Sequence, residues 1–181
     1  DRGKIKMIKV RFLEEADIRH GHRVLDFGCG TGTLTIMGKQ KYPEAAFVGL
    51  DVDENILRIA RKKISQKGLD ISIDSYDGFN LPYEDNSFDR VISSFVFHHL
   101  ATDQKKEMLR QMHRILKSDG KVHILDFGNP QTRIAKGIMR IFSMFEPVDD
   151  NVKGLIPEYM KNADFADVRK VRDFRELWGT F

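Results

Sequence analysis

The sequence predicts an α/β fold: a doubly wound, mostly parallel seven-stranded sheet with an antiparallel last strand and helices on both faces. Three observations predict it. Short apolar runs typical of buried strands alternate along the chain with segments of helical periodicity. The first such run, 24–27, leads into a glycine-rich turn, and the second, 45–51, ends in an aspartate. This succession is typical of a Rossmann-like sheet that binds its ligand at the carboxyl ends of the strands.

Composition limits the classes of protein to consider. A chain of 181 residues with 41% hydrophobic and 31% charged residues predicts a single domain over residues 1–181. One cysteine, Cys29, excludes an internal disulfide framework, and we expect no metal site. A net charge of +3 is too small to indicate a nucleic-acid partner. With no signal-peptide pattern and no apolar run of membrane-spanning length, we expect a fragment of a cytoplasmic protein.

Residues 1–20 predict a basic amphipathic helix. Four apolar residues recur at helical spacing and five basic residues crowd the same segment: Ile5, Ile8, Phe12 and Leu13, with Arg2, Lys4, Lys6, Lys9 and Arg11. We prefer a solvated basic face beside the domain. Peripheral contact with an anionic membrane surface, or a lid at the substrate entrance, stays open as the alternative.

The turn after the first strand predicts a ligand cradle. Gly28, Gly30 and Gly32 allow the backbone to turn sharply and to approach a ligand closely. The dinucleotide fingerprint G-x-G-x-x-G would need a glycine at position 33, where Thr33 stands, so a nicotinamide cofactor is the weaker alternative. A tight strand–helix connection without a ligand stays open until partners are found downstream.

Acidic residues follow the next two strands. Asp51 ends the strand 45–51 near the spacing at which a carboxylate accepts hydrogen bonds from ribose hydroxyls, and Asp53 is placed to cap the helix 54–67. Asp77 and Gly78 follow a short third strand over 71–74, where an adenine ring would lie if the first two strands hold an amino acid and a ribose. Asp77 is a candidate acceptor for the adenine amino group.

Several motifs together resemble a known family. The pattern D-x-G-x-G-x-G from Asp26 to Gly32 resembles motif I of the class I S-adenosylmethionine-dependent methyltransferases. The run 77–100 resembles the signature of their small-molecule branch, which includes the ubiquinone and menaquinone biosynthesis C-methyltransferases. Six residues fall in its order and spacing: Asp77, Leu81, Pro82, Phe88, Asp89 and His99. Residues 116–127 resemble the family's Leu-Lys-Pro-Gly-Gly turn and fifth strand, with Ser118 and Asp119 in place of Pro and Gly.

The resemblance, which covers roughly residues 20–127, implies S-adenosylmethionine as cofactor and S-adenosylhomocysteine as product. Asp26 would then face the ammonium group of the ligand, directly or through water. The cofactor-binding residues that we expect are Asp26, Gly28, Gly30, Gly32, Asp51, Val52, Asp77, Gly78, Ser94, Phe95 and His99.

Two histidines follow the fourth predicted strand, 88–96. His98 is the candidate general base, because imidazole titrates near neutral pH and this strand ends at the same crevice as the first. His99 matches a family position that contacts the cofactor. The alternative is that both histidines serve packing at a hinge.

The sequence of the last third of the chain predicts a helical segment that covers the acceptor-binding site. Residues 128–162 form a predicted helical insert in which Phe142 and Phe145 belong to an apolar stripe, and we assign them to the substrate pocket. An ordinary core role for this stripe stays open. A strand over 165–171 and an antiparallel strand over 174–181 would complete the sheet.

The predicted function is transfer of a methyl group from S-adenosylmethionine to a small, apolar or aromatic acceptor, with a quinone-like ring as the leading example. Alignment for in-line displacement supplies roughly 7–11 kcal/mol, so no catalytic triad is expected. The alternatives are a nicotinamide-dependent oxidoreductase and a non-catalytic cofactor-binding scaffold. The sequence does not distinguish C-, O- and N-methylation.

Overall fold

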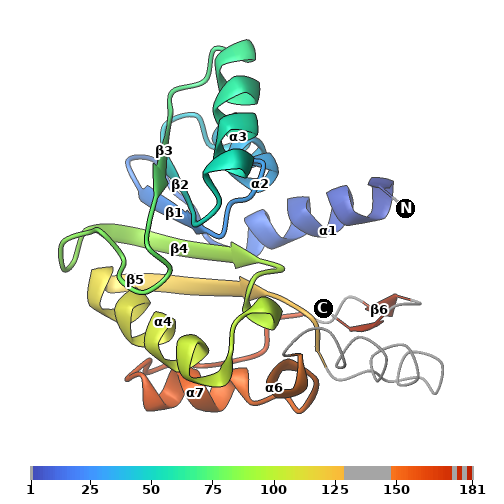
Figure 1. The fold of residues 1–181 in the computed structure, drawn as a ribbon, viewed down its shortest axis with the longest axis vertical. Coiled ribbons are helices and arrows are strands. Elements are labelled where there is room, and N and C mark those ends of the chain that lie inside the picture. The colour runs from blue at the N-terminus through green and yellow to red at the C-terminus, as the bar shows by residue number, and fades with distance from the viewer. Residues whose placement is uncertain (1, 129–147, 173–174, 177–178, 181) are drawn as a thin grey trace. The chain divides into compact units, whose positions relative to one another are not determined.

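A computed structural model of the chain describes residues 2–128, 148–172, 175–176 and 179–180 (Figure 1). The chain forms two compact units, which we describe separately. The first contains Asp1–Ser94 and Arg114–Ile124, and the second contains Phe95–His113 and Leu125–Phe181. The single domain expected over residues 1–181 stays a prediction.

The first unit is built on a five-stranded sheet in the order β3-β2-β1-β4-β5. Its strands are β1 (Arg23–Phe27), β2 (Ala46–Asp51), β3 (Ile71–Ser75), β4 (Phe88–Ser94) and β5 (Leu116–Leu125), of which Leu125 already belongs to the second unit. β1 pairs in parallel with β2 and β4, and β2 pairs in parallel with β3. Val24 to Phe27 are all buried although successive side chains point to opposite faces, so both faces of β1 are covered.

Three helices belong wholly to the first unit: α1 (Arg2–Glu15), α2 (Thr33–Lys41) and α3 (Glu54–Gln66). α2 lies along β2 and α3 lies along β3. α3 begins as predicted at Asp53, whose carboxylate accepts hydrogen bonds from the backbone N–H groups of Asn55 at 2.8 Å and Ile56 at 3.4 Å.

The packing face of α1 is shorter than the sequence predicts. Ile8, Phe12 and Leu13 are buried, but residues 3–7 are all exposed. The prediction that Ile5 shares the packing face is therefore wrong, because the contact face of the helix begins only at Ile8. Helical geometry also ends at Glu15, short of residue 20.

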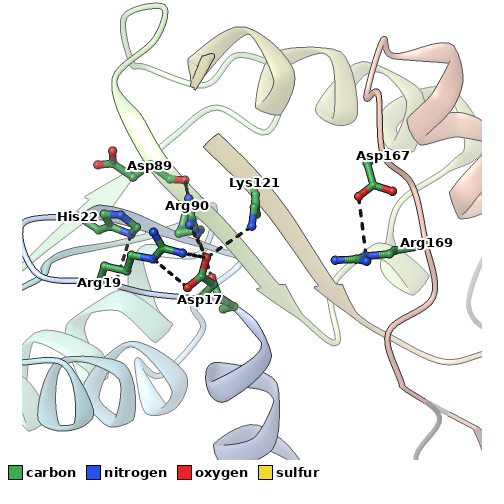
Figure 2. A network of polar contacts seen from close by, with 9 residues as sticks. Asp17, Arg19, His22, Asp89, Arg90, Lys121, Asp167 and Arg169 are labelled. Carbon is green, nitrogen blue, oxygen red and sulfur yellow. Dashed lines mark hydrogen bonds and ion pairs between the residues drawn. The ribbon is translucent and has the colours of Figure 1, made fainter. Parts of the chain in front are cut away.

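An ionic cluster fixes the end of α1 to the sheet (Figure 2). Asp17 accepts two hydrogen bonds from Arg19, at 2.9 and 2.8 Å, and forms ion pairs with Arg90 on β4 at 3.2 Å and Lys121 on β5 at 3.4 Å. The hydrogen bonds from Arg19 lower the pKa of Asp17 to about 2. Arg90 Nε also donates to the carbonyl oxygen of Ala16 at 3.0 Å, so a buried guanidinium joins β4 to the residue after the helix.

β5 begins at Leu116, directly after α4 (Thr102–Ile115). The sequence resemblance implied a turn over 116–120. These residues belong to the first half of the ten-residue strand, but the chain folds back within them, because position 120 lies against the backbone of Lys117. A side chain at Gly120 would lie 2.9 Å from the carbonyl oxygen of Lys117, so the glycine accommodates close contact between neighbouring backbone segments.

The second unit is mainly helical in its described part. It contains a short 3-10 turn, η1 (Phe97–His99), most of α4, and the helices α6 (Asp149–Val152) and α7 (Ile156–Asn162). η1 and α6 lie against each other. Two short strands, β6 (Arg175–Glu176) and β7 (Gly179–Thr180), pair with each other in antiparallel fashion.

The predicted seven-stranded sheet is confirmed only in its five-stranded part. Residues 165–171, predicted as a strand, have no regular secondary structure, because their apolar residues do not alternate and most of the segment is exposed. The antiparallel last strand is not confirmed, since β7 pairs only with β6 in the described structure. No helix among the described residues has the length and apolar character needed to cross a bilayer.

Candidate functional site

The glycine turn between β1 and α2 forms the floor of the candidate site. Gly28, Gly30 and Gly32 all have positive φ angles, of 69°, 54° and 71°, which a residue with a side chain adopts only with strain. The N–H groups of Gly28 and Cys29 donate to the carbonyl oxygen of Leu50, at 2.8 and 3.0 Å, and fix the turn to the end of β2. A side chain at Gly30 would meet only Ile56, at 4.0 Å, so this face of the turn is open.

Asp51 joins the turn to the start of α3. Its Oδ2 accepts a hydrogen bond from Gly30 N at 2.8 Å, and its Oδ1 accepts one from Asp53 N at 3.1 Å. Asp51 is half-buried at the carboxyl end of β2. Each carboxylate oxygen has a second lone pair, so Asp51 can accept hydrogen bonds from a ligand while it holds the turn.

Asp26 lies beneath the same turn. Only 1% of its surface is exposed, and its Oδ2 accepts a hydrogen bond of 2.6 Å from the hydroxyl of Thr35. Burial raises the pKa of Asp26 to about 6. Sequence reasoning identified Asp26 but missed Thr35, whose only signal is a polar residue among the apolar positions at the start of α2.

The segment after β3 contributes the remaining residues of this site. Tyr76 N donates to the carbonyl oxygen of Asp51 at 3.3 Å, and a side chain at Gly78 would lie 3.6 Å from Val52 Cγ1. Gly78 has a φ of 86°. These contacts place Val52 beside Gly78, at the edge where β2 and β3 end.

Asp77 is held in a tight local turn. Its Oδ1 accepts hydrogen bonds of 2.8 Å from the N–H groups of Phe79 and Asn80, and these bonds lower the pKa of Asp77. Val52 and Phe79 are 55% and 65% exposed, which is unusual for apolar side chains. Phe79 was not among the residues assigned to the site from the sequence, because an aromatic residue after a glycine carries no specific signal.

Eight of the predicted residues therefore meet at the carboxyl ends of β1, β2 and β3: Asp26, Gly28, Gly30, Gly32, Asp51, Val52, Asp77 and Gly78. In an open parallel sheet this edge is the usual place for a nucleotide-like ligand. Cys29, in the middle of the turn, is buried against Gly49, and burial raises the pKa of its thiol, so it serves as a packing residue.

In the second unit, His98 forms a hydrogen-bonded pair with Asp126. The distance from His98 Nδ1 to Asp126 Oδ1 is 2.7 Å, and the two side chains are 6% and 5% exposed. Because a carboxylate only accepts hydrogen bonds, this contact assigns a ring proton to Nδ1, and in the neutral imidazole the lone pair is then on Nε2. Asp126 Oδ2 also accepts from Val96 N at 3.1 Å and from His98 N at 3.3 Å.

Aromatic contacts fix the His98 ring further. Its centroid lies 3.9 Å from that of His99 and 4.6 Å from that of Phe127, which meets it edge-on. His98 is buried, whereas His99 is exposed. Sequence reasoning missed Asp126, although its position directly after β5 repeats the pattern of an acid at a strand end.

The chain passes between the two units at Ser94 and Phe95. Ser94 is the half-buried last residue of β4, and Phe95 has a φ of 60°, which is rare for a bulky residue and indicates strain. Phe95 N donates to the carbonyl oxygen of Leu125 at 2.8 Å. Backbone strain of this kind is concentrated at functional sites.

The two predicted pocket residues, Phe142 and Phe145, lie outside the described residues, as does most of the helix expected there. Within the described part of the chain, no three His, Cys, Asp or Glu side chains are grouped closely enough to hold a metal ion.

A family model described as a methyltransferase domain matches residues 24–120. The demethylmenaquinone methyltransferase of Lactobacillus johnsonii is 36% identical over 139 residues, which are 75% of this chain and 56% of that protein. The ubiquinone/menaquinone biosynthesis C-methyltransferase of Cupriavidus taiwanensis is 30% identical over 159 residues, 87% of this chain and 65% of that protein. The chain thus spans about half to two thirds of the length of these curated relatives.

Among solved structures, phosphoethanolamine N-methyltransferase 2 of Haemonchus contortus, in complex with S-adenosyl-L-methionine, superposes with a TM-score of 0.75. It is 23% identical, and the match covers 88% of this chain and 36% of that one. A likeness at this identity establishes the fold. With the match over residues 24–120, it shows that the chain belongs to the methyltransferase-domain family and has the fold of the S-adenosylmethionine-dependent methyltransferases.

Proposed function

We propose that the chain transfers a methyl group from S-adenosylmethionine to a small, apolar or aromatic acceptor, for which a quinone-like ring is the leading example. The observation that carries this proposal is the contact of Asp51 with Gly30 at 2.8 Å, which joins an acid at the end of β2 to an open glycine turn at the end of β1. The names of the two curated relatives support the quinone-like acceptor.

The residues at this edge fit the parts of the ligand. Asp51 accepts hydrogen bonds from the ribose hydroxyls, and Gly28, Gly30 and Gly32 let the backbone approach the ligand closely. When bound, the sulfonium supplies a methyl group that is already activated, so the protein chiefly orients the reactants and excludes water.

The adenine ring would lie between the exposed apolar side chains of Val52 and Phe79, next to Gly78. A flat aromatic ring covers such apolar surface well. Asp77 is the acceptor for the adenine amino group, since its Oδ2 receives only a long contact of 3.5 Å from the Asn80 amide.

Asp26 places a negative charge beneath the turn, where it attracts the ammonium group at the amino-acid end of the ligand. Ser94, Phe95 and His99 are proposed to border the cofactor, and Phe142 and Phe145 to line the acceptor pocket. These five assignments rest on the sequence.

His98 is the proposed general base. Methyl transfer releases a proton from the acceptor, and His98 Nε2 accepts it while Asp126 holds the ring through Nδ1. The pair has the arrangement in which a buried carboxylate selects one tautomer of a catalytic histidine.

Titration calorimetry of the purified chain tests the cofactor. We expect micromolar binding of S-adenosylhomocysteine and no binding of NAD under the same conditions. The opposite result would support an oxidoreductase, and binding of neither would leave a scaffold without this cofactor. An acceptor screen with quinols and phenols follows a positive result.

Two aspartate variants make the test specific to the site. Asp51→Ala should weaken S-adenosylhomocysteine binding by about 1–3 kcal/mol, because it removes an acceptor for the ribose hydroxyls. Asp53→Ala is the matched control: it removes the cap of α3 and lowers stability by about 1 kcal/mol, with a smaller effect on affinity. Unchanged affinity in Asp51→Ala would remove this residue from the site.

A further inference from the structure

Asn151 on α6 carries an amide group that is buried without a hydrogen-bond partner. Only 2% of the residue is exposed, and neither its Oδ1 nor its Nδ2 makes a hydrogen bond within the described part of the chain. Leaving a buried amide unpaired is costly, so such groups are normally paired with the protein, with ordered water or with a ligand. The two unpaired atoms of Asn151 therefore point to a partner that is not part of the protein.

The position of Asn151 is fixed by the residue before it. Asp150 Oδ2 accepts hydrogen bonds from Thr102 Oγ1 at 2.7 Å and from Lys105 Nζ at 3.4 Å, both on α4. Lys105 is fully buried, so separating this ion pair would leave a buried ammonium group without its carboxylate. Consequently, α6 cannot rotate to expose the Asn151 amide to water without losing the contacts of Asp150.

The buried face of α6 belongs to the same unit as the His98 ring. Val148, directly before α6, and Asn151 are one helical turn apart and are both buried, whereas Asp149 is exposed. The short turn η1, with the buried His98 at its centre, lies against α6. The Asn151 amide and the proposed general base thus come from neighbouring elements of the second unit.

We propose that Asn151 binds a hydroxyl group on the acceptor ring, so that the acceptor is a hydroxylated aromatic compound. This inference rests on the proposed function. An amide accepts a hydrogen bond at Oδ1 and donates one at Nδ2, and the oxygen substituents of a hydroxylated ring can pair both atoms. Because Asn151 is buried, little water competes for these hydrogen bonds, and they hold the ring beside His98.

The same contacts distinguish acceptors that differ in a single group. A hydroxyl group donates to Oδ1, whereas a carbonyl oxygen or a methyl ether can only accept from Nδ2, and a methyl group pairs neither atom. An acceptor that reaches Asn151 must displace the side chains that now cover it, and its hydrogen bonds to the amide offset part of that cost. A site of this kind selects against analogues that lack the hydroxyl group.

Two naphthalene derivatives test this selection by fluorescence titration of the protein saturated with S-adenosylhomocysteine. The probes 1-naphthol and 1-methylnaphthalene carry a hydroxyl and a methyl group at the same ring position. We expect Asn151→Leu, which removes both polar atoms, to weaken 1-naphthol binding by about 3- to 10-fold. The same variant should bind 1-methylnaphthalene at least as tightly as the wild-type protein does.

Three controls accompany this comparison. Asn151→Ala, with a smaller side chain, should show the same selective loss if leucine packs poorly at this position. Asp149→Asn, on the exposed side of the same helix, should bind both probes as the wild-type protein does. All variants should keep the wild-type affinity for S-adenosylhomocysteine, which shows that they are folded, because neither residue is proposed to bind the cofactor.

The outcomes separate this inference from the proposed function. Failure of the wild-type protein to bind S-adenosylhomocysteine would overturn both. With the cofactor product bound, failure to bind 1-naphthol, or 1-naphthol binding that neither Asn151 variant weakens, would overturn the role of Asn151 alone. An equal loss for 1-naphthol and 1-methylnaphthalene would show that Asn151 supports packing and does not contact a hydroxyl group.

Discussion

Asp26 is a carboxylate that the fold buries almost completely, with the Thr35 hydroxyl as its side-chain hydrogen-bond donor. Its pKa rises from the ordinary 3.8 to about 6. This rise in pKa corresponds to about 3 kcal/mol that disfavours the folded state once the carboxyl group is ionised. The free protein is thus less stable at neutral pH because of a charge that its ligand would use.

We therefore expect Asp26→Asn to change how stability depends on pH. In the wild-type protein, the contribution of Asp26 to the free energy of unfolding is lost as pH rises from about 4 through about 6. Relative to the Asn variant, the wild-type protein should lose up to about 3 kcal/mol over this window. Urea unfolding at several pH values measures the difference, and parallel curves for the two proteins would contradict it.

The same substitution should weaken S-adenosylhomocysteine binding, because it removes the charge beneath the turn. Stability and affinity would then change in opposite directions at pH 7. This combination distinguishes a ligand-directed carboxylate from one that only supports packing.

Asp126 has a different residue-scale role, which is to orient His98. In Asp126→Asn the side-chain amide can donate to Nδ1, which would move the ring proton to Nε2 and remove the base. We expect the nitrogen-15 spectrum of His98 to change from the Nδ1-protonated to the Nε2-protonated tautomer. With an acceptor from the screen, turnover should fall by about 10²–10⁴-fold.

Affinity for S-adenosylhomocysteine is the control for Asp126→Asn, since Asp126 is not among the residues proposed to bind it. An unchanged tautomer with full turnover would show that His98 and Asp126 serve packing only.

At the scale of elements, α2 packs on β2 through a glycine. A side chain at Gly38 would lie 2.7 Å from Cζ of Phe47, a buried residue of β2. The helix can approach the strand this closely only because position 38 has no Cβ. The glycine turn connects β1 to the start of α2. The close packing of α2 on β2 therefore also fixes the orientation of this turn relative to the sheet.

Gly38→Ala should therefore destabilise the protein, although alanine is normally favoured over glycine inside a helix by roughly 1 kcal/mol. Steric overlap with Phe47 should reverse the sign and cost about 1–3 kcal/mol. Denaturant unfolding measures the change. The double variant Gly38→Ala with Phe47→Leu should recover part of the loss, and a stabilising Gly38→Ala would contradict the packing.

At the scale of the whole molecule, ligand binding should be visible as a change in thermal stability. At a concentration of 100 times its dissociation constant, S-adenosylhomocysteine adds about 2.7 kcal/mol. For a chain of 181 residues this raises the unfolding temperature by about 5–10 °C. Calorimetry with NAD in place of S-adenosylhomocysteine is the control and should give no shift.

The sequence predicts which residues end the strands better than it predicts the burial and the partners of individual charged side chains. Asp51 and the three glycines are identified because their roles follow from local order: a buried strand, then an acid or a turn. Lys9 was predicted to lie on a solvated face but is half-buried, because burial is a tertiary property that no local pattern encodes. Asp126 was missed for the same reason, since its partner His98 lies 28 residues earlier in the chain.

The failure of the strand predicted over residues 165–171 also has a physical cause. Residues 165–171 contain apolar side chains without strict alternation, so neither a strand nor a loop was excluded by the pattern. Phe165 instead meets His113 edge-on, at a centroid distance of 5.1 Å. The Phe165 ring, which the sequence assigned to a strand, therefore packs against a helix residue.

Cys29 gives the chain a built-in chemical reporter. It is the single thiol of the sequence, it lies between the first two glycines of the turn, and it is buried there with a raised pKa. Alkylating reagents react with the thiolate, so they modify this residue only when the turn opens. The rate of maleimide labelling is consequently a direct readout of turn dynamics, and a molecule that occupies the turn would protect the thiol without any mutation or added probe.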